Sequence, residues 1–289
     1  MKNLKQLIKK YIPNRLSSHI RLSILLLIVW LDLMGVISTL LNMRSNMFLQ
    51  TVSRTHPGKV RQNNEDSIAT LDNRNFFAIA DGMGGHAFGQ IASQLAVDAC
   101  IEYVSALTRK PIMDSESELA TAVSFANEAI ITIQQNEEKY RDMGTTLTCA
   151  SLYDNKLYFS WVGDSRLYLI KSSDSSIEML TRDHTLDRKK IDARLAPDLY
   201  KRAPNILTQK VGSILLLKPD TGSVAVMPND ILLACTDGLT DKVSDQWILD
   251  CISNCRTDLD QCADKLIERA LDCGGQDNIS LILAAISAH

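Results

Sequence analysis

The stretch that decides the fold is Asp81-Gly82-Met83-Gly84-Gly85-His86. It follows the apolar run 76–80, which is typical of a buried strand, so Asp81 comes where a strand ends and a glycine-rich turn begins. The glycines remove side-chain bulk, so backbone carbonyls and the carboxylate can approach a small ligand closely. A hard cation fits this turn better than a phosphate, because a phosphate loop needs a Lys and a Ser or Thr directly after its glycines. Taken alone, the six residues also fit an ordinary Asp-Gly turn.

Four more turns along the chain carry acidic residues, and most of them adjoin an apolar or β-rich run. They are Asn64-Glu65-Asp66, Gly163-Asp164-Ser165-Arg166, Thr236-Asp237-Gly238 and Asp277-Asn278. Strands that finish at one edge would bring these carboxylates into one cleft, where they repel one another unless cations lie between them. Oxygen ligands without His or Cys select magnesium or manganese over zinc or copper. The sequence therefore predicts a hard-cation site at the ends of strands.

Six ordered motifs carry a family resemblance that is far more specific than any one of them. They are Gly58-Lys59-Val60-Arg61 with Asn64-Glu65-Asp66, Asp81 to His86, Met143-Gly144-Thr145-Thr146, Gly163-Asp164-Ser165-Arg166, Thr236-Asp237-Gly238-Leu239 and Gly275-Gln276-Asp277-Asn278. The chain closely resembles the bacterial metal-dependent serine/threonine protein phosphatases of type 2C, the PPM family, over roughly residues 50 to 287. The resemblance implies hydrolysis of phosphoserine and phosphothreonine in proteins by a metal-bridging water, in opposition to a bacterial Ser/Thr kinase.

The resemblance also implies where two Mn²⁺ or Mg²⁺ ions would bind. Asp81 would bridge both ions, and the Gly82 carbonyl would join one of them. Asp237 and Asp277 would hold the second ion. With Arg61, the three aspartates form the predicted catalytic set.

Further positions match supporting roles in the resembled family. Arg61 matches the phosphate-binding arginine, whose planar fork suits two phosphate oxygens. Glu65 and Asp66 would orient metal-bound waters, and Asp164 would help to hold a third, weaker ion. Asn278 would steady the site through hydrogen bonds.

The acid that protonates the leaving group is left open by the sequence. Family members outside bacteria have a histidine where Met83 stands, so a histidine acid at that position is absent here. His86 and His184 are candidates by position, although each also fits a structural role, and a metal-bound water could serve instead.

Charge is unevenly distributed along the 289 residues. Residues 1–46 hold seven Lys or Arg and one acid, whereas the rest of the chain holds 24 basic and 33 acidic residues. An acidic body argues against a nucleic-acid partner and hence against a two-metal nuclease. A non-catalytic phosphoprotein-binding module of the same fold is the other rival, but it would be expected to have lost one or more of Asp81, Asp237 and Asp277.

The N-terminal extension, residues 1–46, precedes every motif. Its apolar run 22–41 holds one charge, Asp32, and is long enough to span a membrane. Two interpretations stay open: an inner-membrane anchor for a cytoplasmic catalytic domain, or a true translation start at Met43 or Met47. We place the catalytic domain at residues 47–289 and expect it to be monomeric.

The seven cysteines are widely spread, and no two of them form a Cys-x-x-Cys pair. Such usage is typical of buried thiols in a reducing compartment. A zinc cluster is the alternative for the last four, Cys251, Cys255, Cys262 and Cys273. Because all four fall in amphipathic helical patterns, we expect small core residues instead.

The remaining pattern predicts an α+β fold. The β-rich runs 146–153 and 156–162 are joined by Asp154-Asn155, a two-residue hairpin signal, and the runs 166–171 and 177–180 repeat the pattern. Consecutive hairpins indicate antiparallel sheet, and the helices are grouped rather than alternating with strands. Two packed sheets with helices outside agree with the α-β-β-α sandwich of the resembled family, whose metals lie in the cleft between the sheets.

Helical periodicity is clearest in four segments. Apolar stripes start at Ile91 and Leu119, a shorter helix is expected after the N-cap Ser244, and another runs from about residue 259 to Gly274-Gly275. Residues 181–212 break the regular pattern with a charged segment. This segment matches the place where family members carry a mobile flap beside the active site.

Overall fold

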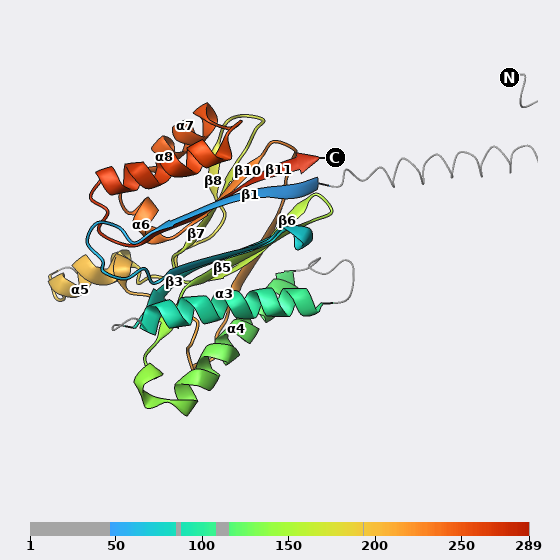
Figure 1. The fold of residues 1–289 in the computed structure, drawn as a ribbon. Helices are drawn as coiled ribbons and strands as arrows, with labels where there is room; N and C mark the ends of the chain where they lie inside the picture. The colour runs from blue at the N-terminus through green and yellow to red at the C-terminus, as the bar shows by residue number, and fades with distance from the viewer. Residues whose placement is uncertain (1–46, 85–87, 108–115, 193, 289) are drawn as a thin grey trace, which may run out of the picture. The chain divides into compact units, whose positions relative to one another are not determined.

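Two antiparallel β-sheets face each other and form the centre of the molecule (Figure 1). The computed structural model describes residues 47–84, 88–107, 116–192 and 194–288. The first sheet has the order β1 (Met47–His56), β11 (Ile279–Ala288), β10 (Ile231–Cys235), β7 (Arg166–Ile170) and β8 (Ile177–Met179). The second has the order β2 (Asp66–Leu71), β3 (Phe76–Met83), β5 (Leu147–Tyr153), β6 (Lys156–Val162) and β9 (Asp220–Ala225), and the short β4 (Gly144–Thr145) also pairs with β3.

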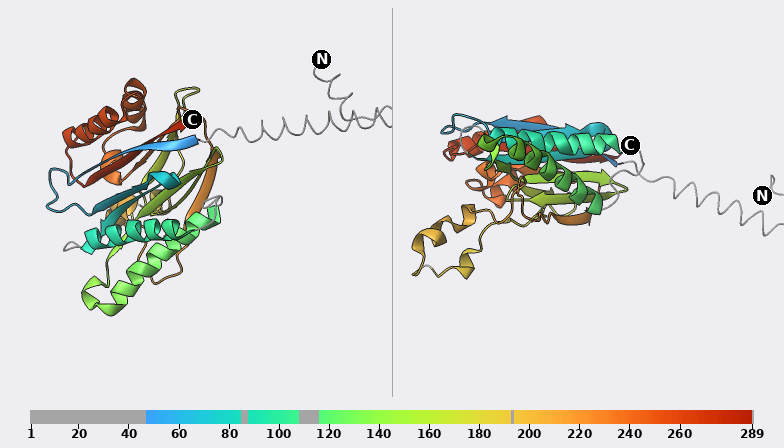
Figure 2. Two further views of the ribbon diagram at one scale, coloured as in Figure 1. Left: turned by 45° about the vertical axis from the view of Figure 1, so that its right-hand side comes forward. Right: turned by 90° about the horizontal axis from the view of Figure 1, so that it is seen from below.

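Helices cover the outer face of each sheet, as Figures 1 and 2 show from three directions. The long helices α3 (Phe88–Ala106) and α4 (Glu116–Asn136) lie on the second sheet. The first sheet is covered by α6 (Asp237–Thr240), α7 (Asp245–Asn254) and α8 (Leu259–Asp272). The predicted α-β-β-α sandwich is therefore confirmed.

The alternation of side chains along each central strand explains why the strands are apolar on both faces. Phe77 and Ile79 of β3 point between the sheets, whereas Phe76, Ala78 and Ala80 pack against the helices. Because side chains of a strand alternate between its two faces, a strand covered on both sides needs a continuous apolar run. Such runs therefore mark the central strands, whose ends carry the acidic residues.

The long helices follow the expected periodicity, with one difference in how they pack. The stripe of α4 is buried as predicted at Leu119, Val123 and Ile130. In α3 the residues Ile91 and Leu95 are only half-buried, and small residues such as Ala92 and Ala96 face the sheet. Small side chains let this helix lie close to β3, which a count of large apolar residues does not reveal.

Local signals in the sequence fix two turns and two caps. Asp154 and Asn155 both have positive φ, 48° and 62°, as a type I′ hairpin turn requires. The Ser244 side chain accepts a hydrogen bond from Trp247 N at 3.3 Å, and Asp258 caps α8 in the same way. Gly274, with φ of 125°, follows the end of α8.

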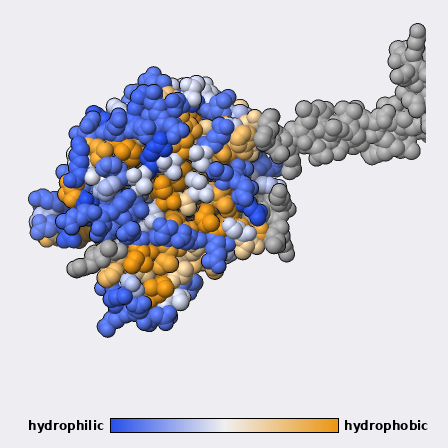
Figure 3. Space-filling model, in the orientation of Figure 1, coloured by the Kyte–Doolittle hydropathy of each residue, from blue (hydrophilic) through white to orange (hydrophobic). Residues whose placement is uncertain are grey.

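The outer faces of α7 and α8 are mostly hydrophilic, as the space-filling view in Figure 3 shows. Their inner faces carry cysteines, and here the structure differs from the sequence prediction. Cys255 and Cys262 form a disulfide, because the end of α7 and the start of α8 lie side by side with a Cα–Cα distance of 5.5 Å. Cys251 and Cys273 are free, and the described residues contain no zinc-type cluster.

Residues 181–212 contain only short elements, namely η3 (Arg188–Lys190), α5 (Pro197–Arg202) and η4 (Ala203–Asn205). Two further 3-10 turns, η1 (Asp72–Arg74) and η2 (Glu138–Tyr140), lie outside this segment. Within the ranges given above, no helix is long and apolar enough to cross a membrane. The predicted span 22–41 lies outside the described residues.

Candidate active site

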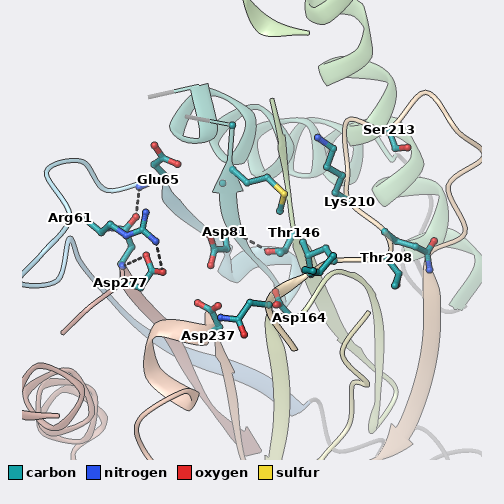
Figure 4. A pocket seen from close by; sticks show the side chains of 18 residues that line it. Arg61, Glu65, Asp81, Thr146, Asp164, Thr208, Lys210, Ser213, Asp237 and Asp277 are labelled. Atoms are coloured by element: carbon teal, nitrogen blue, oxygen red, sulfur yellow. Dashed lines mark hydrogen bonds and ion pairs between the residues drawn. The ribbon is translucent and has the colours of Figure 1, made fainter. Parts of the chain in front are cut away.

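Four aspartates from separate strand ends meet at one pocket between the sheets (Figure 4). Asp81 lies near the end of β3, Asp164 follows β6, Asp237 follows β10 and Asp277 precedes β11. The pocket has a volume of about 700 Å³. It is also lined by Arg61, Glu65, Gly82, Met83, Gly84, Thr146, residues 205–210, Ser213 and Asn278. The prediction that strand ends gather these four carboxylates in one cleft agrees with the geometry.

The backbone of Asp81 is held by two threonines of the motif Met143-Gly144-Thr145-Thr146. Asp81 N donates to Thr146 Oγ1 at 2.8 Å, and Thr146 N donates to the Asp81 carbonyl at 2.9 Å. Thr145 Oγ1 donates to the same carbonyl at 2.8 Å. These bonds fix the strand end that presents the carboxylate, although nothing local in the sequence reveals that Thr145 and Thr146 face Asp81.

Gly82 lies where three segments of chain come together. Its N–H donates to the Glu65 carbonyl at 3.0 Å, and a Cβ at this position would collide with the Gly89 and Glu65 carbonyl oxygens. A side chain at residue 82 would therefore push apart β3, α3 and the loop before β2. Close approach of backbone, rather than an unusual φ, explains this glycine.

Asn278 joins the loop before β2 to the start of β11. Its Nδ2 donates to the carbonyls of Pro57 and Asn63, both at 2.9 Å, and its Oδ1 accepts from Glu65 N at 2.8 Å. All the hydrogen-bonding groups of the amide thus position the segment that carries Arg61 and Glu65.

Arg61 and Asp277 form an ion pair at the rim of the pocket, with Nη2 to Oδ2 at 2.7 Å (Figure 4). The two side chains are 56% and 39% exposed, so a ligand in the pocket can reach both. The carboxylate of Asp277 is the main cause that raises the pKa of Arg61, which is a permanent cation in any case.

Asp66 differs from the other predicted metal-site residues because it is buried beneath the pocket rather than lining it. It lies opposite Asp81 in the β2–β3 register, and its Oδ2 accepts from Thr236 Oγ1 at 2.9 Å. Its other oxygen, Oδ1, has no hydrogen-bond partner. Asp66 therefore sits behind Asp81 and Asp237, with one oxygen uncompensated.

Asp164 stands at the edge of a charged network. Arg166 donates to both carboxylate oxygens of Asp183, with Nη2 to Oδ2 at 2.8 Å and Nε to Oδ1 at 3.0 Å.

The His184 ring stacks on Trp161 and accepts from Gly163 N through Nδ1, while Nε2 lies 3.2 Å from Asp220. These contacts hold His184 outside the pocket lining and give it a structural place. The other candidate acid, His86, lies outside the described residues.

Burial and mutual repulsion raise the pKa values of four acids of the site, namely Asp66, Asp81, Asp164 and Asp237, and so make them costly to ionise together. Burial first, and then the carboxylates of Asp164 and Asp277, raise the pKa of Asp237 to about 7. Burial raises the pKa of Asp164 to about 6 and that of Asp66 to about 7. The pKa of Asp81 is raised well above its usual range by burial and by the neighbouring carboxylates of Asp66 and Asp237. Positive charge placed among them would reverse this cost.

The donor set fits hard divalent cations. Asp66 Oδ1 and Asp237 Oδ1 are buried without a hydrogen-bond partner, which is expensive unless another ligand satisfies them. All the candidate donors are oxygens, as Mg²⁺ and Mn²⁺ prefer. Within the described ranges no three acidic, His or Cys side chains already close around a single point.

One side of the pocket is formed by the end of the segment 181–212, which was predicted to lie beside the active site, and by Ser213, which was not predicted. Residues 205–210 and Ser213, which follow α5, line it opposite Arg61 and Asp277 (Figure 4). Lys210 Nζ donates to the Asp142 carbonyl at 3.0 Å. The sequence predicted a flap over residues 181–212 but did not indicate which of its side chains line the pocket.

Comparison with known proteins agrees with this arrangement. The family model described as Protein phosphatase 2C matches residues 55–272. The chain is 34% identical over 240 residues to the serine/threonine phosphatase stp of Listeria welshimeri, with 80% of this chain and 93% of that protein covered. It is 33% identical over 245 residues to the serine/threonine protein phosphatase PstP of Mycobacterium tuberculosis. That match covers 84% of this chain but only 46% of PstP, so the chain spans about half the length of this relative.

Solved structures resemble the whole sandwich. The catalytic domain of PstP, crystallised with two manganese ions, has a TM-score of 0.70 and 32% identity over 84% of this chain and 100% of that one. The serine/threonine phosphatase of S. agalactiae has a TM-score of 0.73 and 27% identity over 84% of this chain and 100% of that one. A pocket of aspartates between two sheets defines a class of metal-dependent phosphatases. The chain belongs to the Protein phosphatase 2C family.

Proposed function

We propose that this chain is a manganese- or magnesium-dependent phosphatase that hydrolyses phosphoserine and phosphothreonine in proteins. The observation that carries the proposal is the meeting of Asp81, Asp164, Asp237 and Asp277 in one pocket with Arg61 on its rim. Relatives named as serine/threonine phosphatases and the two manganese ions in the PstP structure support it.

Each acidic side chain has a proposed part in this chemistry. Two divalent ions bound here would lower the pKa of water and neutralise charge on the phosphate. Asp81 lines the pocket with the other acids. It is proposed to be shared by the two ions, with the Gly82 carbonyl joining one of them, while Asp237 and Asp277 would hold the second. Thr145 and Thr146 keep the Asp81 backbone in place.

Arg61 is proposed to bind the phosphate. Its Nη2 already donates to Asp277, and a guanidinium has five N–H donors, so the remaining ones can receive two phosphate oxygens. The ion pair with Asp277 holds Arg61 beside one of the proposed metal ligands. Arg61 would thus orient a bound phosphate for attack by water.

Glu65 and Asp66 are proposed to orient water, and Asp164 to hold a third ion. Glu65 lines the pocket and can act directly, whereas the buried Asp66 would act from behind Asp81. Asp164 is separated from Arg61 by the pocket. After burial, the carboxylate of Asp183 contributes most to raising the pKa of Asp164. A weaker ion there would relieve the repulsion between these two acids.

The proposal extends to the setting of the enzyme. We place the catalytic domain at residues 47–289, as a cytoplasmic monomer that opposes a Ser/Thr kinase. Residues 22–41 would anchor it to the inner membrane if translation begins at Met1. The compact unit Asn46–His289 supports the boundary.

Hydrolysis of a phosphothreonine peptide by the full chain, with manganese and with a chelator, tests the function. Activity that needs manganese and is lost in Asp81→Asn supports the enzyme. Binding of the phosphopeptide without turnover at any manganese concentration would instead identify a phosphoprotein-binding module.

A further inference from the structure

Three consecutive apolar side chains stand in solvent beside the candidate active site. Ile214, Leu215 and Leu216 are 81%, 77% and 85% exposed. Single exposed apolar residues are common on protein surfaces, but a contiguous group often marks a binding surface. Among the described residues only one other large hydrophobic side chain, Leu195, is as exposed as these three.

The segment that carries them is firmly attached at both ends. Asn127 Oδ1 of α4 accepts from Gly212 N at 2.8 Å and from Ser213 N at 3.1 Å. Gln134 Nε2, also from α4, donates to the Gly212 carbonyl at 2.9 Å. At the other end, Leu217 packs against the core between the second sheet and its helices. The fixed backbone therefore holds residues 214–216 outward.

A second hollow, of about 750 Å³, lies beneath this segment. Its apolar side is formed by Ile214 and Leu215, and its polar side by the end of α4 and by Glu138, Arg141 and Asp142. Because Arg141 alternates with two acids, the polar side carries no strong charge of one sign. The hollow therefore suits an apolar side chain better than a phosphate or another ion.

The hollow adjoins the candidate active-site pocket. Lys210 and Ser213 line both cavities, and Figure 4 shows them on the side of the pocket away from Arg61 and Asp277. An extended chain whose phosphate reaches Arg61 can therefore leave the pocket past Lys210 and Ser213 and pass over Ile214 and Leu215.

We propose that residues 214–216 and the hollow beneath them bind an apolar stretch of the substrate protein, close in sequence to the phosphorylated Ser or Thr. This inference rests on the proposed phosphatase function and names its substrate class: phosphoproteins with apolar residues near the phosphosite. The shared rim favours a substrate over a second copy of this chain, because a segment bound there is already directed into the pocket.

The test uses the full chain with manganese and three kinds of substrate. These are a small aryl phosphate, a phosphothreonine peptide with polar flanks, and a peptide set in which one Leu is moved through about six positions on either side, a reach of about 20 Å in an extended chain. The wild type should prefer Leu at one or two positions by about tenfold in kcat/KM, as expected when one large apolar side chain is buried.

Substitution of all three residues (Ile214→Ser, Leu215→Ser, Leu216→Ser) should abolish this preference through KM and leave turnover of the aryl phosphate and polar peptide unchanged. The matched control is Met227→Ser, since Met227 is 61% exposed in the turn between β9 and β10, at the end of β9 away from the pocket. The single variant Leu216→Ser, at the most exposed of the three positions, should weaken the preference even if the triple variant folds poorly.

Two results would overturn the inference. The first is equal hydrolysis of all peptides by the wild type, which would leave the phosphatase function intact and remove the docking site. The second is a concentration-dependent dimer in sedimentation that the triple variant loses, which would assign the surface to a second copy. Failure of the wild type to hydrolyse any phosphate ester with manganese would instead refute the proposed function, and the inference with it.

Discussion

The two walls of the pocket are built in different ways. The acidic wall, formed by Asp81, Asp164, Asp237 and Asp277, consists of strand ends held by backbone bonds such as those between Asp81 and Thr146. The segment wall, residues 205–213, is mostly irregular chain after α5, fixed through α4 at Gly212. Catalytic groups need a rigid scaffold, whereas a loop can change its side chains without disturbing it. The comparison suggests that chemistry lies on the first wall and substrate choice on the second.

The largest expected effect comes from the acidic wall. Asp81→Asn keeps the shape but removes an anionic ligand shared by two ions, so kcat should fall by about three orders of magnitude or more with every substrate. Calorimetric manganese titration should show greatly weakened binding. A folded Asp81→Asn protein with wild-type turnover would break the assignment of chemistry to this wall.

An intermediate effect is expected at Arg61, because it is proposed to contact the phosphate rather than the ions. Arg61→Ala should leave manganese affinity near wild type and raise KM by about tenfold to a hundredfold, with a smaller loss in kcat. Arg54→Ala is the matched control, since Arg54 pairs with Asp260 and Asp264 on the outer surface. Loss of manganese binding in Arg61→Ala would mean that its pair with Asp277 maintains the metal site itself.

Asp164→Ala should have a moderate effect within the acidic wall. Two ions should still bind, while kcat falls by a few-fold because a weak third ion loses its ligand. Calorimetry should show one weak site missing in Asp164→Ala. The control is Asp183→Asn, which weakens the contact with Arg166 but leaves the proposed ligand Asp164 in place. An unchanged number of sites in Asp164→Ala would make Asp164 a structural turn residue.

The pH dependence of stability tests the raised pKa of Asp237, which results first from burial and then from neighbouring carboxylates in the acidic wall. In chelator, the pKa of Asp237 is about 7, above the value of about 3.9 in an unfolded chain, so the folded state binds more protons between these pH values. This contribution to stability is complete below about pH 4 and is lost as the pH rises towards 7. Thermal melts should show that Asp237→Asn stabilises the chelated protein more at about pH 7 than at about pH 5. The opposite order would contradict the raised pKa of Asp237.

The smallest effect is expected from the N-terminal extension, because it supplies no residue to either wall. A protein that starts at Met47 should be soluble and hydrolyse a phosphothreonine peptide at the wild-type rate. If it folds but is inactive, as judged by circular dichroism and assay, residues 1–46 belong to the catalytic unit and the boundary at residue 47 is wrong.

The acidic wall could be predicted from the sequence because its signal is local. An apolar run followed by Asp and Gly marks a strand end, and this held at Asp81 and Asp237. The hairpin at Asp154 and the cap at Ser244 are equally local and also agree with the structure.

The segment 181–212 was predicted to lie beside the active site, but the side chains that line the pocket could not be predicted because they depend on distant contacts. The same is true of residues 214–217, an apolar run that follows the segment wall: bonds from Asn127 and Gln134 to the preceding Gly212 and Ser213 accompany exposure of its first three side chains. The disulfide of Cys255 and Cys262 was likewise missed, since it depends on how two helices meet. Thr146 and Asp66 lie in predicted motifs, but only the packing shows which neighbour each of them touches.

The position of β11 links the site to the order in which the ribosome makes the chain. This last described strand pairs with β1, the first, and with β10, so it enters the middle of a sheet whose other strands were synthesised earlier. Asp277 and Asn278 immediately precede it. A nascent chain that has not yet released this strand therefore lacks the strand that joins β1 to β10 and two of the residues proposed for the active site.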